Sequence, residues 1–149
     1  EAAYAAGVGK KIELTVGASL DPNGSKPFTG TFEVIFLAQT DTAADRQAVV
    51  RIGGIDLVVH AKRRPFHNIA DFTTLGLDPR TAKIIAVKSG YLSPELAPIA
   101  NPNLMVLSTG VVDQFIERLE RKRKMHPTYP WDKDFTFEPE AFVSARAAG

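Results

Sequence analysis

The stretch AVVRIGGIDLVVH, residues 48–60, decides the fold. Two apolar runs flank the pair Gly53-Gly54, which is the composition that a two-residue hairpin turn prefers. Such a turn fixes the register and places Arg51 opposite Asp56. This cross-strand ion pair contributes about 0.2–1 kcal/mol. The sequence therefore predicts an antiparallel hairpin in the main sheet, and it gives Arg51 and Asp56 a structural role.

Two further strands are predicted before the hairpin. Residues 10–16 alternate apolar and polar side chains, which is typical of a half-buried strand. Residues 28–37 begin with the same alternation and become apolar on both faces at Ile35 and Leu37. The end of this second strand should therefore be more deeply buried than its beginning.

Three segments have helical patterns. Glu1–Tyr4 should form the last turns of a helix stopped by glycine, which indicates that the chain continues something upstream. Asn68 and Asp71 have the spacing of a helix cap before a short helix over 68–75. The repeat of apolar residues over 112–119 predicts the clearest helix.

The sequence KIIAVKSGYLSPELAP, residues 83–98, contains the main candidate site. Its apolar run predicts a central buried strand over 83–87. A turn formed by Lys88, Ser89, Gly90 and Tyr91 follows, and we call it the Lys-Ser-Gly-Tyr turn. Ser93-Pro94-Glu95 then has the composition of a capped helix start. A glycine-containing turn between a strand and a helix N-terminus favours binding of an anion or a carboxylate. The alternative is a plain connection with an exposed lysine.

These elements predict an α+β fold. We expect a mostly β, mixed sheet of about six strands with the central buried strand, the Gly-Gly hairpin and two or three helices. Residues 1–149 should form a single domain, a fragment of a longer protein, and residues 126–149 its extended C-terminal tail.

Composition excludes several classes of function. The 149 residues carry a formal net charge of +1, so the overall basic field typical of nucleic-acid binding is missing. The sequence has no cysteine, which excludes disulfides and thiolate metal sites and fits a cytoplasmic protein. No apolar run has the length of a membrane span. We therefore expect neither a nucleic-acid nor a membrane partner.

Basic residues form two clusters. The segment HAKRRPFH, residues 60–67, adds Arg64 and His67 as weaker substrate-binding candidates. His60 and His67 have no carboxylate nearby except Asp71, so no metal site is expected here. The basic residues over 118–124 favour either a solvated helix end or an anionic partner.

The order of four segments resembles the C-terminal domain of the microcystinase C (MlrC) family of zinc metallopeptidases. These segments are AAGVGKKIELTVGASLDP (5–22), RQAVVRIGGIDLVVHAKRRPF (46–66), FTTLGLDPRTAKIIAVKSGYLSPELAPIANP (72–102) and TYPWD (128–132). The resemblance spans roughly Ala5 to Asp132 and is specific through the order and spacing of these segments.

The resemblance implies a function for the whole polypeptide. In that family a larger N-terminal domain carries the zinc ligands, so zinc belongs to the full-length protein and none is expected in this chain alone. The chain would then be an accessory, substrate-facing domain of a peptidase or amide hydrolase, not catalytic alone. Its partners would be its own N-terminal catalytic domain or a companion chain, and a small peptide or amide substrate.

Under this reading, Lys88, Ser89 and the amides around Gly90 would supply donors to the substrate, with Tyr91 beside them. A non-catalytic scaffold or oligomerisation domain, including a homo-oligomer, is the alternative. Anion or nucleic-acid binding through residues 118–124 is the weakest of the three readings.

Overall fold

The computed structural model describes residues 1–18, 25–107, 115–118, 123, 125–136, 138–140 and 142–144. The chain divides into two compact units, Glu1–Val106 and Leu107–Gly149, and each is described by itself.

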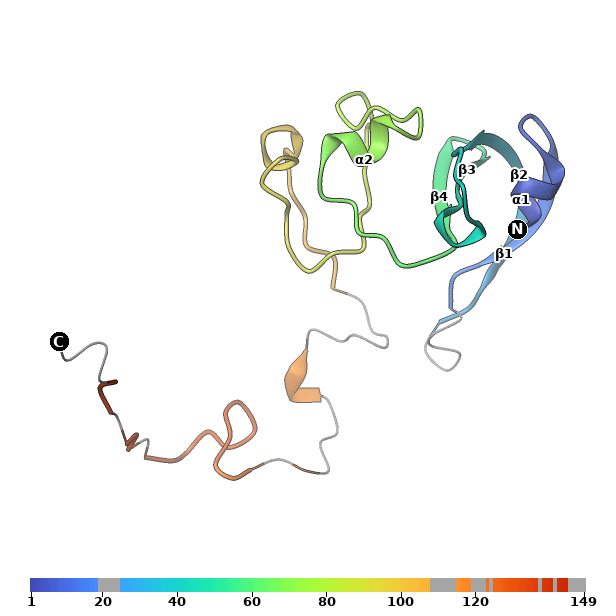
Figure 1. Cartoon of the computed structure of the whole chain (residues 1–149). Helices are drawn as coiled ribbons and strands as arrows, with labels where there is room; N and C mark the ends of the chain where they lie inside the picture. The colour runs from blue at the N-terminus through green and yellow to red at the C-terminus, as the bar shows by residue number, and fades with distance from the viewer. Residues whose placement is uncertain are drawn as a thin grey trace. The chain divides into compact units, whose positions relative to one another are not determined.

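A four-stranded antiparallel sheet forms the centre of the first unit (Figure 1). Its strands, β1 (Lys11–Val16), β2 (Phe28–Leu37), β3 (Gln47–Ile52) and β4 (Ile55–His60), pair in the order of the sequence. With the short helices α1 (Ala2–Ala6) and α2 (Ile69–Thr73), this arrangement confirms the mostly β, α+β fold class. The sheet over the described residues is antiparallel, however, and not mixed as expected.

The Gly-Gly hairpin is confirmed, with β3 and β4 as its strands. Ile52 pairs with Ile55 and Arg51 with Asp56, which is the predicted register. The guanidinium Nη2 of Arg51 donates to Asp56 Oδ2 at 2.9 Å, and this hydrogen bond is the main cause that lowers the pKa of the Asp56 carboxyl. Gly53 has a φ of 55°, a conformation that a side chain would strain.

A bulge in β2 decides which core each of its side chains enters. The pairing with β3 shifts register between Val34 and Phe36. An extra residue on one strand reverses the alternation of side chains beyond it. Val34 therefore packs on one face of the sheet and Phe36 on the other, although their spacing in the sequence predicts a shared face.

The two faces of the sheet carry separate cores, because neighbours such as Val49 and Val50 point in opposite directions. One core lies under α1 and the other under α2 (Figure 1). The buried members of the first are Ala3, Phe32, Val34, Ala48 and Val50, and those of the second are Val49, Phe66, Phe72, Leu75 and Leu96.

The first two helical predictions are confirmed with changed bounds: the helix expected at Glu1–Tyr4 is Ala2–Ala6, and the helix expected over 68–75 is shortened to Ile69–Thr73. Gly7, with a φ of 85°, follows α1. The hydroxyl of Tyr4 on this helix donates to the carbonyl of Gln47 at 3.1 Å and so ties the helix to the sheet. Asn68 caps α2 in a capping box with Asp71, as the spacing predicts.

The central buried strand predicted over 83–87 is wrong. These residues belong to no strand, and the side chain of Ile84 is 88% exposed. An apolar run becomes a central strand only where strands flank it on both sides. The four strands of the described sheet pair with one another instead, and only Val87 packs against the second core.

The predicted helix start after the Lys-Ser-Gly-Tyr turn is also corrected. Ser93 begins a turn that leads into the short 3-10 helix η2 (Ala97–Ile99), but its hydroxyl caps no amide. The hydroxyl donates instead to the carbonyl of His67, and the Ser93 side chain is buried. Two short 3-10 helices complete the elements, η1 (Ala43–Asp45) and η3 (Ile116–Arg118).

In the described part of the second unit, residues 126–132 form a turn held by Asp132. Asp132 Oδ2 accepts from the amide of Thr128 at 2.8 Å and lies 2.8 Å from His126 Nδ1. Tyr129 in this turn is 73% exposed. Residues 112–114 and 119 of the helix predicted over 112–119 lie outside the described residues, and Ile116–Arg118 within it form the 3-10 helix η3.

Candidate functional site

The basic loop between β4 and α2, residues 61–67, is fixed by the half-buried carboxylate of Asp71. Asp71 accepts from the amides of His67 and Asn68, each at 2.9 Å, and from Arg64 Nη2 at 3.1 Å. Burial alone would raise the pKa of Asp71, but these three hydrogen bonds outweigh it and hold the pKa below its ordinary value. Arg64 is therefore held as a charged side chain at the edge of α2.

The Lys-Ser-Gly-Tyr turn packs against the end of this loop. The ring of Tyr91 meets the ring of His67 edge to face, with centroids 5.5 Å apart. The Tyr91 hydroxyl lies 3.4 Å from both ring nitrogens of His67, too far for one strong hydrogen bond. The buried hydroxyl of Ser93 donates to the carbonyl of the same histidine and fastens the two segments together.

The residues of the turn differ in which of their polar groups remain open to a ligand. Ser89 Oγ donates to the carbonyl of Tyr91 at 3.0 Å and so closes the turn. A side chain added at Gly90 would meet nothing within 4 Å, so the backbone there is open to approach. Lys88 is exposed and makes no ion pair or hydrogen bond with any other described residue. The turn thus offers an uncompensated ammonium and an open backbone on a fixed frame.

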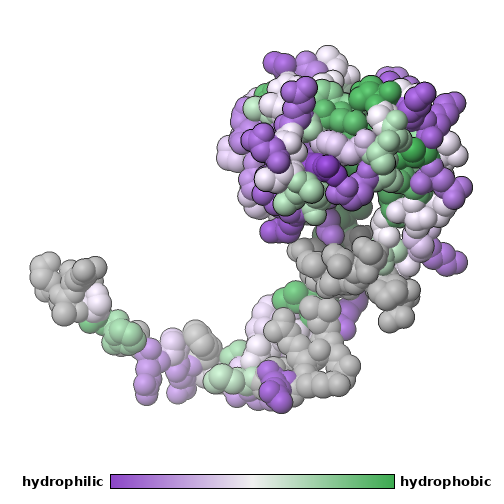
Figure 2. Space-filling view, turned by 45° about the vertical axis from the view of Figure 1, so that its right-hand side comes forward, coloured by the Kyte–Doolittle hydropathy of each residue, from purple (hydrophilic) through white to green (hydrophobic). Residues whose placement is uncertain are grey.

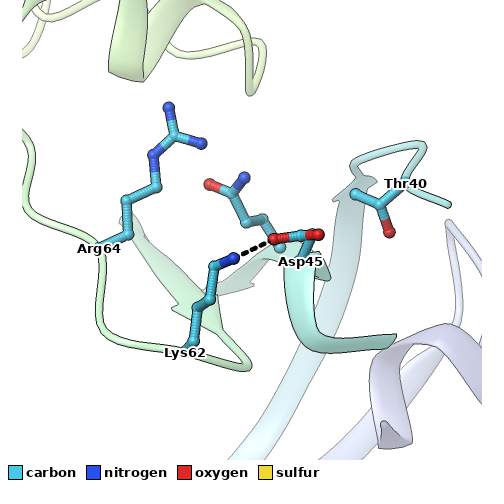
Figure 3. A pocket seen from close by; sticks show the side chains of 5 residues that line it. Thr40, Asp45, Lys62 and Arg64 are labelled. Atoms are coloured by element: carbon cyan, nitrogen blue, oxygen red, sulfur yellow. Dashed lines mark ion pairs between the residues drawn. The ribbon is translucent and has the colours of Figure 1, made fainter. Parts of the chain in front are cut away.

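A polar pocket of about 220 Å³ has Arg64 as one of its lining residues (Figure 3). It is lined by Thr40, Asp45, Gln47, Lys62 and Arg64. Lys62 points toward Asp45 and forms an ion pair with it. The hydrogen bond that the Lys62 ammonium donates to Asp45 is the main cause that lowers the pKa of the Asp45 carboxyl. The charges of the pocket are thus largely paired.

The structure brings together most of the residues that the sequence singles out. Tyr91 and His67 are in contact, and Arg64 is joined to the backbone of His67 through Asp71. Sequence reasoning missed the role of Ser93, because its position before a proline indicates a helix cap. It also missed the pocket at Lys62, for which the sequence shows no motif.

A family model described as the MlrC C-terminus matches residues 1–123. The chain belongs to the MlrC C-terminus family. The match covers β1 to β4, α2 and the Lys-Ser-Gly-Tyr turn, and it ends before the turn at Thr128. No significant match was found among curated proteins or among solved structures.

The described part of this MlrC domain does not fit a zinc ion. Over the described residues, no three His, Cys, Asp or Glu side chains lie close enough to hold a metal. The ring of His67 contacts the ring of Tyr91, and it is the backbone amide of this histidine that donates to the Asp71 carboxylate. In the same residues, no helix is both long and apolar enough to cross a membrane.

Replacing Asp71 by Ala should destabilise the MlrC domain by about 1–2 kcal/mol at neutral pH, because the capping box and the partner of Arg64 are lost together. The folded-state pKa of Asp71 is lowered, so its contribution is fully present above the ordinary carboxyl pKa. It disappears as the pH falls through the folded-state pKa. Urea unfolding at neutral and at acidic pH measures both effects.

Asp41→Ala is the matched control, because Asp41 is exposed and makes no hydrogen bond or ion pair with the described residues. It should change the free energy of unfolding by less than about 0.5 kcal/mol. Equal losses in the two variants would show that Asp71 does not fix the loop.

Proposed function

We propose that this MlrC domain is the accessory, substrate-facing part of a zinc metallohydrolase that cleaves a peptide or amide bond. The zinc ligands would lie in an N-terminal domain or companion chain, and we call the two together the longer MlrC polypeptide. The family match over residues 1–123 supports membership of such a polypeptide. The cysteine-free composition supports a cytoplasmic location.

The observation that carries the proposal is the free ammonium of Lys88 on a rigid turn. A cation without an internal partner attracts a carboxylate or the charge that develops on a reacting carbonyl. The amide at Gly90 is open to the same ligand. The exposed ring and hydroxyl of Tyr91, which pack against His67, lie in the same turn and could orient a substrate.

Arg64 has a secondary role in this proposal. Its guanidinium is already paired with Asp71 at 3.1 Å, and the side chain is 42% exposed. A paired cation attracts an incoming anion less than a free one does, because its charge is largely neutralised. Arg64 therefore stabilises the loop that presents His67, and Lys88 is the first binding candidate.

A scaffold or oligomerisation domain is the second candidate function. The specific observation in its favour is the set of exposed apolar residues after α2, among them Ile84 and Leu104. Such residues mark contact surfaces in many proteins. Under this alternative, substitution of Lys88 would leave turnover of the longer polypeptide unchanged.

Metal analysis tests the proposed function. Purified residues 1–149 should hold no stoichiometric zinc after dialysis, whereas the longer MlrC polypeptide should hold it and should lose hydrolysis when a chelator removes it. Readdition of zinc should restore hydrolysis of a small peptide or amide. Stoichiometric zinc in residues 1–149 alone would contradict the proposed division of roles.

A further inference from the structure

Two apolar runs of the first unit are exposed to solvent. In the first run Ile84 is 88% exposed, and in the second Leu104 and Val106 are 74% and 81% exposed. Both runs have the β-branched and aliphatic composition of strands. Figure 2 shows hydrophobic side chains at the surface of this unit among hydrophilic ones. Side chains of this size are rarely left adjacent in water without a partner.

Among the described residues, the backbone of both runs is largely unpaired as well, and in the first run only the carbonyl of Val87 accepts a hydrogen bond, from the amide of Ser89. Over the described residues, neither Lys83–Ala86 nor Leu104–Val106 takes part in any backbone hydrogen bond. In Figure 1 the chain between α2 and the end of the first unit carries no strand arrow. Free amides and carbonyls together with exposed apolar side chains are the two properties of a strand that adds to another sheet.

The charges at the ends of the first run restrict what can pair with it. Lys83 and Lys88 flank four apolar residues. If the run paired with itself in a second copy, an antiparallel register over its whole length would place Lys83 opposite Lys88. A parallel register would place each lysine opposite its own counterpart. Like charges directly opposite each other destabilise a strand pair, so a second copy fits poorly.

The occupant that fits is an extended apolar segment with carboxylates at its ends. We propose that Ile84–Val87 and Leu104–Val106 join a sheet of the N-terminal part of the longer MlrC polypeptide, through a segment of this kind. This inference rests on the proposed function, because an accessory domain needs a surface that contacts the catalytic part. Obligate interfaces are more hydrophobic than transient ones, and the two runs lack any charged side chain.

The position of Lys88 gives this docking a consequence. Lys88 follows Val87 directly, so pairing of the run would place the Lys-Ser-Gly-Tyr turn at the boundary between the two parts. Val87 already packs against the second core, which fixes the end of the run relative to Tyr91 and His67. Docking would therefore orient the free ammonium toward the neighbouring part.

Hydrogen exchange of the backbone amides tests the docking. In the longer MlrC polypeptide, the amides of both runs should exchange at least about tenfold more slowly than in residues 1–149 alone. Equal exchange in the two samples would overturn the inference. Protection in residues 1–149 that grows with protein concentration would also overturn it, because a second copy would then be the occupant.

Paired variants add a second readout. With the N-terminal part produced as a separate chain, Ile84→Lys combined with Val106→Lys should weaken its binding to residues 1–149 by at least about tenfold. Val8→Lys combined with Ile55→Lys is the matched control, since these side chains are also exposed, at 59% and 66%, but lie outside both runs. Equal weakening by both pairs would overturn the inference.

Zinc-dependent hydrolysis of the same samples separates this inference from the proposed function. A longer polypeptide that protects both runs but holds no zinc would support the docking and contradict the proposed function. A zinc-dependent hydrolase whose two runs exchange freely would contradict the docking alone.

Discussion

Replacing Lys88 by Met in the longer MlrC polypeptide should lower its turnover at least about tenfold without unfolding it. Methionine keeps most of the length of the side chain and removes the charge. A tenfold loss corresponds to about 1.4 kcal/mol of transition-state stabilisation, within the range of one charged hydrogen bond. Stability should not fall, because Lys88 makes no ion pair or hydrogen bond with the described residues.

Two further variants show whether a loss of turnover comes from the charge at position 88. Lys11→Met makes the same change on the exposed face of β1, and it should leave turnover and KM unchanged. Lys88→Arg keeps the charge and should recover part of the loss. Unchanged kinetics in Lys88→Met would contradict the substrate-facing role and favour the scaffold alternative.

Replacing Phe72 by Ala should have the largest effect on stability, a loss of about 3–5 kcal/mol. Phe72 is 8% exposed and joins α2 to the core on that face of the sheet. Its ring meets Phe66 edge to face, with centroids 5.0 Å apart. Removal of the ring leaves a cavity beneath the loop that presents His67, so denaturant unfolding should shift strongly.

Phe142→Ala is the control for this prediction. The same atoms are removed at a side chain that is 91% exposed, so little buried surface is lost. The expected change is below about 0.5 kcal/mol. If the two variants were equally stable, the core under α2 would contribute little to the fold.

Local signals in the sequence predict the fold where the partner of a segment is its neighbour in the chain. Gly53-Gly54 gives both the hairpin and its register, and the spacing of Asn68 and Asp71 gives the cap of α2. These features depend on turn chemistry and capping within a few residues. They need no knowledge of distant contacts.

Features that depend on distant partners are less predictable. The bulge between Val34 and Phe36 arises from pairing with β3 and leaves no signature in β2 itself. Ile84 belongs to a run with the composition of a buried strand, yet it is exposed because none of the described strands pairs with it. The composition of a segment shows that it is able to form a strand, and the presence of a pairing strand decides whether it forms one.

The candidate site shows the same division. The sequence identifies Tyr91 and His67 separately, but their contact depends on how two loops pack over α2. Ser93 is an example of such a distant contact. The Ser-Pro-Glu sequence predicts that its hydroxyl caps a local helix, but the hydroxyl donates to the carbonyl of His67, 26 residues away. A hydroxyl has both options, and the burial of Ser93 favours the distant one.

The most direct test of the account is a crystal structure of the longer MlrC polypeptide with zinc and an unreactive substrate analogue. If the Lys-Ser-Gly-Tyr turn faces the substrate, Lys88 Nζ or the amide of Gly90 will lie within about 2.7–3.2 Å of an oxygen of the analogue. A structure in which the analogue is bound while the Lys-Ser-Gly-Tyr turn faces only solvent would contradict the account.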